Sequence, residues 1–312
     1  TANTNVIAIF GTVLTESHRK GQDGRHRMFN AGIVAQRGQM IGRSYKTLFP
    51  NYRIFRDTRH HMGPRELAEE LSHLYEESWG VEGVQGCTVE QLIDPIVAHI
   101  DGIPISIGVI NCEDMWHEDY ALNPTKILVR KGAEIIFNLS ASPWTWQKNR
   151  KRHQVVKRLL ASCPVPFVYV NNTGIQNTGK NIVVFDGSST VYNSTGDITH
   201  QVPPYADDLY ECVIGKDFHP INLPPGNDVE ELFNALTCTV NQTVSLLPPP
   251  MRKVVIGLSG GIDSAVMAAL YAHCIGPENV YCINMPFTYT SEATKDLAAL
   301  TAQALGVHYK IT

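Results

Sequence analysis

The stretch Ile256-Gly257-Leu258-Ser259-Gly260-Gly261-Ile262-Asp263-Ser264 decides the fold of the C-terminal part of this chain. It begins in an apolar run and ends where a helical pattern starts, so backbone N–H groups and a helix N-terminus converge on one point. Such a point binds anions. Gly260 and Gly261 permit close backbone approach, and the carboxylate of Asp263 is a ligand that Mg²⁺ accepts. The stretch therefore predicts a phosphate site.

The residues around this stretch alternate between strand and helix patterns. We expect strands at 254–258 and 280–284 and helices at about 262–274 and 291–305. This alternation predicts the start of a doubly wound parallel sheet. Only two strands of it are apparent before residue 312, and so few cannot bury both faces of such a sheet. We expect this domain to lack its C-terminal part.

The N-terminal two thirds of the chain also read as α/β. Helix-patterned segments separate several β-rich runs, and two further pairs of runs flank turns like those of hairpins, so a purely parallel sheet is not expected. The runs lie at 6–10, 32–36, 105–111, 135–139 and 167–171. Three prolines interrupt the sequence at 219–226. We therefore predict domains at residues 1–218 and 228–312, joined by a linker at 219–227.

Bulk composition favours small-molecule chemistry. With 312 residues, 43% of them hydrophobic, the chain is long enough for two cores. The formal net charge of -4 gives no field that would gather nucleic acid or coat a membrane. The seven cysteines show no CxxC spacing, which favours a cytoplasmic location. Residues 1–5 lack an initiator Met and a signal peptide, so we expect the chain to lack its N-terminal part too.

Cys112 directly follows the apolar run at 105–111. Its thiol is then expected on a sharp turn at the carboxyl end of a strand, where ligands gather. A nearby cation can lower the pKa of such a thiol enough for it to attack a carboxamide. The same position also fits an inert core cysteine, the interpretation given to the other six cysteines.

Two segments of the C-terminal domain resemble a known family. SGGxDS at 259–264 resembles the pyrophosphate loop of the N-type ATP pyrophosphatases, which cleave ATP to adenylate a substrate. The segment at 284–292 resembles the one that follows the second strand in NAD synthetases. The resemblance implies ATP and Mg²⁺, with Asp263 toward the metal. The implied ATP-binding residues are Gly257, Leu258, Ser259, Gly260, Gly261, Ile262, Asp263 and Ser264.

Two segments of the N-terminal domain resemble the nitrilase, or carbon-nitrogen hydrolase, superfamily in its glutaminase branch. They are Tyr-Lys-x-x-x-Pro-Asn-Tyr at 45–52 and Cys-Glu-Asp-x-Trp at 112–116. The resemblance implies an αββα sandwich with Cys112 as nucleophile and Lys46 as the cation that stabilises the oxyanion. It also implies glutamine contacts from Tyr52, Ser142 and Lys148. The family has arginine where this chain has Lys148, so a carboxylate contact there would be single rather than forked.

Two departures from the family pattern stand out. The superfamily's general base is a glutamate N-terminal to the lysine segment, and the one glutamate before Lys46 is Glu16. Glu16 falls in a polar stretch that we expect to be a loop and that matches no base segment, so we assign no base. The stretch at 171–180 also differs from the acidic pair that many relatives carry.

Together the resemblances imply a two-step enzyme. Glutamine would be hydrolysed through a thioester at Cys112, and its ammonia would displace AMP from adenylated nicotinic acid adenine dinucleotide to give NAD. A homo-oligomer is implied as well. Three alternatives remain: a free-standing amidase with an ATP-binding module, a different adenylating enzyme such as a GMP synthetase, and an inactive structural fragment. The second of these is weakened because such enzymes carry other amidotransferase domains or none.

Overall fold

The computed structural model describes residues 5–20, 24–52, 54–79, 87–177, 179, 181–207, 209–214, 220–223 and 226–312. By internal packing these form two compact units. The first comprises Thr1–Asn172 and Gly187–Pro224, and the second comprises Thr173–Asp186 and Pro225–Thr312. Part of the predicted linker lies outside the described residues, so its limits stay a prediction.

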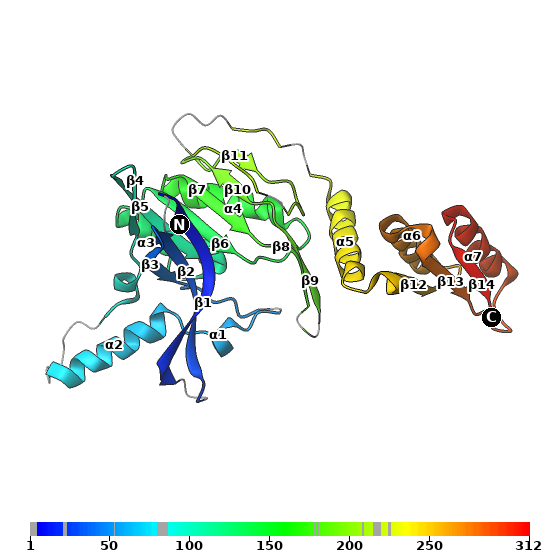
Figure 1. Ribbon diagram of the computed structural model, residues 1–312, viewed down its shortest axis with the longest axis horizontal. Coiled ribbons are helices and arrows are strands. Elements are labelled where there is room, and N and C mark those ends of the chain that lie inside the picture. Colours follow the sequence, from blue (N-terminus) through cyan, green and yellow to red (C-terminus); the bar gives the residue numbers. More distant parts are fainter. Residues whose placement is uncertain are drawn as a thin grey trace. The chain divides into compact units, whose positions relative to one another are not determined.

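The first unit contains two β-sheets (Figure 1). The smaller is antiparallel, in the order β1-β2-β3, with β1 at Ile7–Lys20, β2 at His26–Gln36 and β3 at Gln39–Tyr45. The larger has the order β11-β10-β7-β6-β5-β4 and is parallel only between β5, β6 and β7. Its strands are Ile96–Ile100 (β4), Ile103–Asn111 (β5), Ile135–Ser140 (β6), Phe167–Asn171 (β7), Thr190–Tyr192 (β10) and Ile198–Gln201 (β11). The prediction of a sheet that is not purely parallel is confirmed, and the two expected hairpins are β2–β3 in the smaller sheet and β10–β11 in the larger one.

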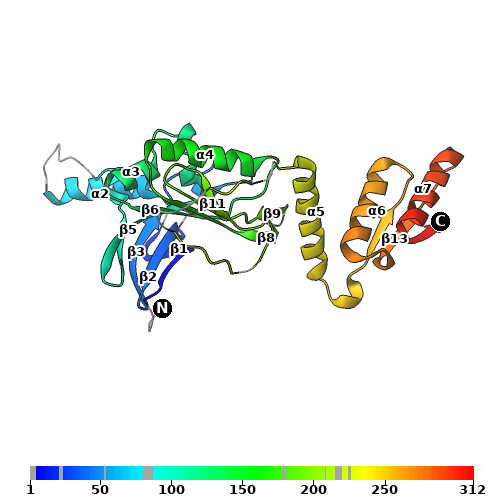
Figure 2. The ribbon, with the colours of Figure 1, turned by 90° about the horizontal axis from the view of Figure 1, so that it is seen from above.

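The larger sheet is covered on one face and partly covered on the other. Helices α3 (Pro124–Arg130) and α4 (Lys148–Ser162) pack on one face through Leu128, Leu159 and Leu160, and the smaller sheet covers part of the other (Figure 2). Helices α1 (Asp57–His60) and α2 (Pro64–Trp79) follow β3, and Met62 between them bridges to Phe29 of β2. Helix packing on sheet and sheet packing on sheet confirm the predicted α/β class.

A glycine sets how closely the two sheets approach each other. A Cβ at Gly32 of β2 would lie 2.6 Å from Cγ1 of Val109 in β5 and 3.3 Å from Cδ1 of Leu139 in β6. Real Cβ contacts are longer, so a larger residue at Gly32 would push the sheets apart. This close approach matters because β3 and β5 each lead into a predicted site residue.

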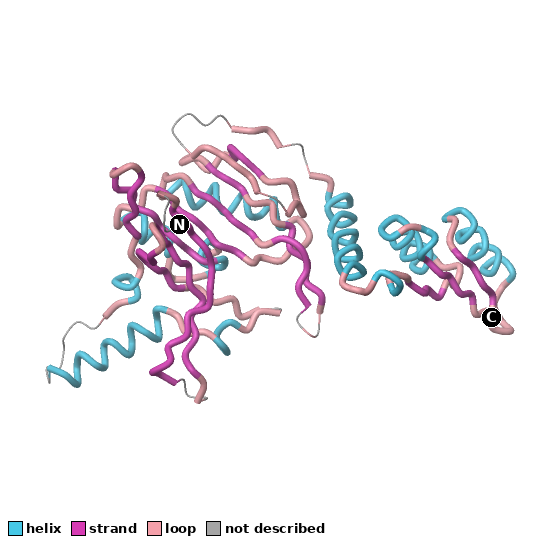
Figure 3. The backbone as a smooth tube through the Cα atoms, in the orientation of Figure 1, coloured by secondary structure: helices cyan, strands magenta, loops and turns pink. Residues whose placement is uncertain are grey.

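The second unit contains a three-stranded parallel sheet in the order β12-β13-β14 (Figure 3). Its elements are α5 (Asp228–Ser245), β12 (Val254–Gly257), α6 (Ile262–Ile275), β13 (Val280–Asn284), α7 (Glu292–Leu305) and β14 (His308–Ile311). The expectation of only two strands is wrong: β14 pairs with β13 although its four residues form no apolar run.

A hairpin from the middle of the chain completes the second unit. Strands β8 (Thr173–Asn177) and β9 (Ile182–Asp186) pair with each other and pack on α5. The backbone N–H of Ile175 donates to Oε1 of Gln242 at 2.9 Å. Gly174 has a φ of +93°, and a Cβ there would lie 2.8 Å from the same oxygen. The second unit is therefore discontinuous in sequence, whereas the predicted domains at 1–218 and 228–312 are continuous segments.

The expectation that Glu16 lies in a polar loop is also wrong. It belongs to β1, opposite Arg27 of β2, in a ladder that continues well past the apolar part of β1. Cross-strand pairing rather than apolar alternation extends the strand here. Among the described residues, no helix is both long and apolar enough to cross a membrane.

Candidate functional site

Cys112 sits on a strained turn at the carboxyl end of β5. Its φ is +47°, a conformation uncommon for a residue with a side chain. Asn138 of β6 holds the turn, because its Oδ1 accepts from the Cys112 N–H at 3.1 Å and its Nδ2 donates to the Cys112 carbonyl at 3.3 Å. The Ser140 hydroxyl donates to the same Oδ1 at 2.6 Å. The neighbouring parallel strand thus fixes the backbone that carries the thiol.

Lys46 follows β3 and is only 4% exposed. Its ammonium forms an ion pair with Asp57, the first residue of α1. Burial lowers the pKa of Lys46, but Cys112 and Asp57 outweigh burial and leave the pKa above its ordinary value. Lys46 is therefore a permanently charged group that acts on the thiol. Asp57 was missed by sequence reasoning, since nothing but its place in the loop after Lys46 marks it.

The thiol pKa is raised overall, although the nearby cations lower it as expected. Burial raises the pKa of Cys112, and the opposing effects of Lys46 and Lys148 are smaller. A buried thiolate loses its hydration, and two ammonium groups only partly replace it. Among the described residues, no hydrogen bond joins the thiol to a carboxylate. The cations of the described residues alone therefore do not bring the thiol to its ionised form at its ordinary pKa.

The predicted glutamine contact Tyr52 lies beside a buried carboxylate. Its hydroxyl donates to Oε2 of Glu113 at 3.2 Å, and the Tyr120 hydroxyl donates to Oε1 of Glu113 at 3.0 Å. Burial raises the pKa of Glu113, although both tyrosines and the lysines oppose the shift. Glu113 was not predicted as a contact, although its position directly after Cys112 was a usable signal.

The two remaining predicted contacts occupy different surroundings. Lys148 opens α4, its Nζ donates to the Pro143 carbonyl at 3.0 Å, and its charge acts on both Cys112 and Glu113. Ser142 is 3% exposed after β6, and its backbone exchanges hydrogen bonds of 2.8 and 3.2 Å with the Asn171 side chain. The structure thus groups Cys112 with both lysines, while the described bonds of Ser142 anchor it to the end of β7.

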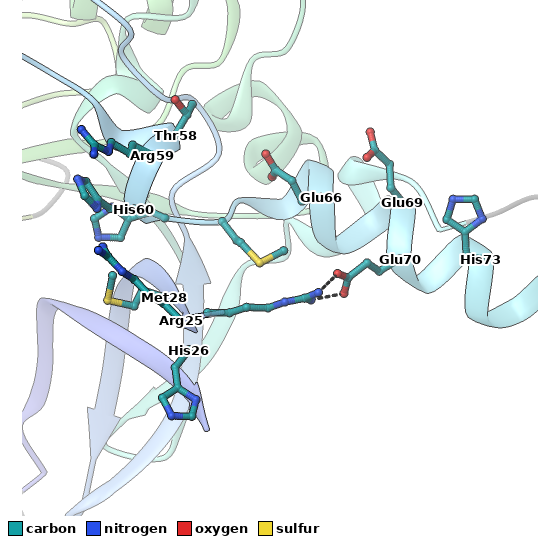
Figure 4. Close-up of a pocket in the computed structure, with 13 residues that line it drawn as sticks. Arg25, His26, Met28, Thr58, Arg59, His60, Glu66, Glu69, Glu70 and His73 are labelled. Atoms are coloured by element: carbon teal, nitrogen blue, oxygen red, sulfur yellow. Dashed lines mark hydrogen bonds and ion pairs between the residues drawn. The ribbon is translucent and has the colours of Figure 1, made fainter. Parts of the chain in front are cut away.

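A separate pocket of about 590 Å³ lies beside α1 and α2, and none of the predicted site residues lines it (Figure 4). It contains His26, His60 and His73 together with the ion pair of Arg27 and Glu70. In the part of the chain that is described, no group of His, Cys, Asp and Glu is arranged to hold a metal ion.

The predicted phosphate loop has the expected form in the second unit. It joins β12 to α6, and the Ser264 hydroxyl lies 3.2 Å from both the Ser259 hydroxyl and the Ser259 backbone nitrogen. The N–H of Gly261 donates to Oγ of Ser259 at 3.2 Å, and the Ser264 hydroxyl donates to the Gly261 carbonyl at 3.0 Å. Asp263 lies in the first turn of α6. The two serine side chains thus fix the conformation of the loop through hydrogen bonds to its backbone.

Gly260 is required by the geometry of this loop. Its φ is +89°, and a Cβ there would lie 3.0 Å from the carbonyl carbon of Thr294 in α7 and closer still to its oxygen. Gly261, by contrast, has a φ of -82° and is the N-cap of α6. The loop backbone therefore passes directly against α7.

Comparison with known proteins identifies the class. Residues 1–212 match the family model described as carbon-nitrogen hydrolase, and residues 232–312 match the one described as NAD synthase. Since the first match covers more than half of the chain, the chain belongs to the carbon-nitrogen hydrolase family. Both resemblances read from the sequence are confirmed.

Two individual relatives share the same name. A Synechocystis protein named glutamine-dependent NAD(+) synthetase is 28% identical over 314 residues, which cover 97% of this chain and 50% of the relative. A Rhodobacter capsulatus protein of the same name is 34% identical over 214 residues, covering 65% and 36%. The chain spans about half the length of the first of these.

Solved structures agree with this fold. The Acinetobacter baumannii glutamine-dependent NAD+ synthetase in complex with ADP has a TM-score of 0.74 at 28% identity, covering 98% of this chain and 50% of that one. The corresponding Cytophaga hutchinsonii enzyme has a TM-score of 0.62 at 14% identity, covering 99% and 52%, and supports the fold alone.

Proposed function

We propose that the protein containing this chain forms NAD from nicotinic acid adenine dinucleotide, with glutamine as nitrogen donor and ATP as activator. One observation carries the proposal: a half-buried Cys112 beside the buried Lys46 and an anion-binding loop occur in two units of one chain. Residues 1–212 and 232–312 match different family models, and one alignment to a named relative spans 97% of the chain. An amidase alone has no use for ATP, and an ATP-activating enzyme alone has no use for glutamine hydrolysis, so their presence in one chain indicates one combined reaction.

The first step is hydrolysis of glutamine at Cys112. The sulfur attacks the carboxamide carbon, the thiol proton ends on the departing nitrogen, and ammonia leaves a glutamyl thioester that water hydrolyses to glutamate. Lys46 stabilises the tetrahedral oxyanion, and Asp57 keeps Lys46 charged. Since burial raises the pKa of Cys112, the cations matter most once negative charge develops.

The recognition groups suit the two ends of an amino acid. The buried carboxylate of Glu113, held by Tyr52 and Tyr120, would accept the glutamine ammonium group, and its two hydrogen bonds support this role. Lys148 offers the glutamine carboxylate one ammonium contact, because it presents a point charge rather than a planar fork. Ser142, fixed through Asn171, completes this set.

The second step takes place at the loop of residues 257–264. The loop backbone at Gly260 and the N-terminus of α6 bind ATP phosphates. Ser259 and Ser264 hold the loop in shape through their hydroxyl contact and the bond from the Gly261 N–H to Oγ of Ser259. One carboxylate beside phosphates is a common Mg²⁺ environment, and Asp263 fits it. Bound Mg²⁺ would neutralise charge on the phosphates. Adenylation of the dinucleotide carboxylate releases pyrophosphate, and ammonia then displaces AMP.

The decisive experiment compares nitrogen donors in the full-length protein. Cys112→Ala is expected to abolish NAD formation from glutamine but to retain it from ammonium, while Cys212→Ala, which alters an exposed cysteine, changes neither. If Cys112→Ala retains both activities, the amidase assignment is wrong. If the wild-type protein hydrolyses glutamine but forms no NAD from either donor, the chain is an amidase with an ATP-binding module.

A further inference from the structure

The two reactive groups of the amidase site come from chain segments that are far apart in sequence and belong to different sheets. Lys46 follows β3 of the smaller sheet, and Cys112 follows β5 of the larger one. No β-ladder among the described strands joins the two sheets, which pack on each other face to face at Gly32 and Val109. Beyond this packing, the separation of the ammonium and the thiol depends on contacts between the residues that follow β3 and those that follow β5.

Asp114 makes that connection. Its Oδ1 accepts the backbone N–H of Thr47 at 3.0 Å and that of Leu48 at 2.7 Å. Its Oδ2 accepts the N–H of Asn111, directly before the nucleophile, at 2.9 Å. One carboxylate thus holds both the residues that follow Lys46 and the residue that precedes Cys112.

We infer that Asp114 is a positioning residue that fixes the Lys46 ammonium relative to the Cys112 thiol, and that it does so only as an ionised carboxylate. The inference rests on the roles proposed above for Lys46 and Cys112. A local cap of the turn at Cys112–Met115 would need only the bond from Asn111. The two further bonds span 66 and 67 residues and join the sheets.

The requirement for charge follows from the donors. Asp114 is 1% exposed, so water does not replace a lost partner. Three N–H groups converge on its two oxygens, and a protonated carboxyl would direct an O–H at one of them. An asparagine fails for the same reason, because its amide nitrogen cannot accept. Lys46 is the charged group that favours the ionised form, whereas burial opposes it and raises the pKa of Asp114 to about 6.

Kinetics of four variants of the full-length protein test the inference. Asp114→Asn is expected to lower kcat for glutamine hydrolysis on the order of 10²-fold with little change in KM, since a small misplacement of reacting groups has this effect. Asp119→Asn, an exposed change on the same loop, is the matched control. Because Asp114 acts through Lys46, the double variant Lys46→Met/Asp114→Asn is expected to be no slower than Lys46→Met alone.

The pH dependence of Cys112 alkylation by iodoacetamide gives an independent readout. In the wild-type protein, log rate against pH is expected to steepen below about pH 6, because protonation of Asp114 adds to that of the thiol. In Asp114→Asn the steepening disappears. Full additivity in the double variant, or an Asp114→Asn variant that behaves like Asp119→Asn, would overturn the inference.

Amide hydrogen exchange keeps the inference testable if Asp114→Asn does not fold. In the wild-type protein at pH 7, the amides of Thr47 and Leu48 are expected to be strongly protected from exchange, because both donate to the ionised carboxylate of Asp114. Free exchange of these two amides at pH 7 contradicts the inference. Should Cys112→Ala retain glutaminase activity, the proposed function fails, whereas the exchange of these two amides still reports on Asp114.

Discussion

Gly260 provides the sharpest test of the phosphate loop through its replacement by alanine. At a φ of +89°, a residue with a Cβ costs roughly 1–2 kcal/mol, by analogy with the left-handed penalty. The new Cβ would also lie 3.0 Å from the Thr294 carbonyl carbon and closer to its oxygen. Backbone cannot rotate away as a side chain does, so overpacking adds about 1–3 kcal/mol. The expected loss of stability is about 2–5 kcal/mol.

Gly261→Ala is the matched control for this substitution. Its φ of -82° suits alanine, and a Cβ there lies 3.4 Å from Oγ of Ser259, so the expected cost is at most about 1 kcal/mol. Urea unfolding of the two variants, followed by ammonium-supported NAD formation, gives the comparison. Equal stability of Gly260→Ala and Gly261→Ala would refute the argument, because only Gly260 meets the α7 backbone.

Three further predictions concern the first unit. Lys46→Met is expected to lower kcat for glutamine hydrolysis by about 10²–10³-fold and to spare ammonium-supported synthesis; an equal loss of both activities would contradict the role of Lys46. The pKa of Asp114 is about 6 in the folded protein against a reference of 3.8 for the unfolded chain. Protonated Asp114 therefore adds to the free energy of unfolding, and this addition is fully present below pH 3.8. It is lost as the pH rises through about 6, which lowers the free energy of unfolding by about 1–3 kcal/mol. Unfolding titrations should show that this loss is absent in Asp114→Asn. Gly32→Ala is expected to destabilise the protein by about 1–3 kcal/mol through its clash with Val109. Gly11→Ala in β1 meets nothing within 4 Å, and an equal melting temperature for the two would refute the sheet-approach argument.

Local sequence patterns predicted the strands whose side chains are buried along most of their length. Strands β5 to β7 form continuous apolar runs because both faces are covered, and they appear within one or two residues of their predicted limits. The polar end of β1 and the short β14 were missed, since pairing with a neighbouring strand stabilises them and no apolar pattern marks them. Propensity carries no information about such a partner.

The site residues also fall into two groups, those that a local motif predicts and those that depend on tertiary contacts. Cys112, Lys46 and the glycine loop were predicted because each lies in a contiguous motif at the end of a strand. Asp57 and Glu113 depend on tertiary contacts, with a lysine in one case and two tyrosines in the other. Burial raises the Cys112 pKa more than the cations lower it, and this net direction was missed, since a sequence shows nearby charges but not the extent of burial. The site roles, the oligomeric state and the cytoplasmic location stay predictions.

The β8–β9 hairpin has a consequence for cutting and rejoining the gene. The chain leaves the first unit after Asn172, supplies two strands to the second and returns at Gly187. A C-terminal fragment beginning near Asp228 would lack those strands and the Ile175 bond to Gln242. A chimaera that exchanges either half with a relative at the linker would combine a foreign hairpin with a resident α5. Residues 173–186 and α5 should therefore be taken from the same parent protein in any chimaera.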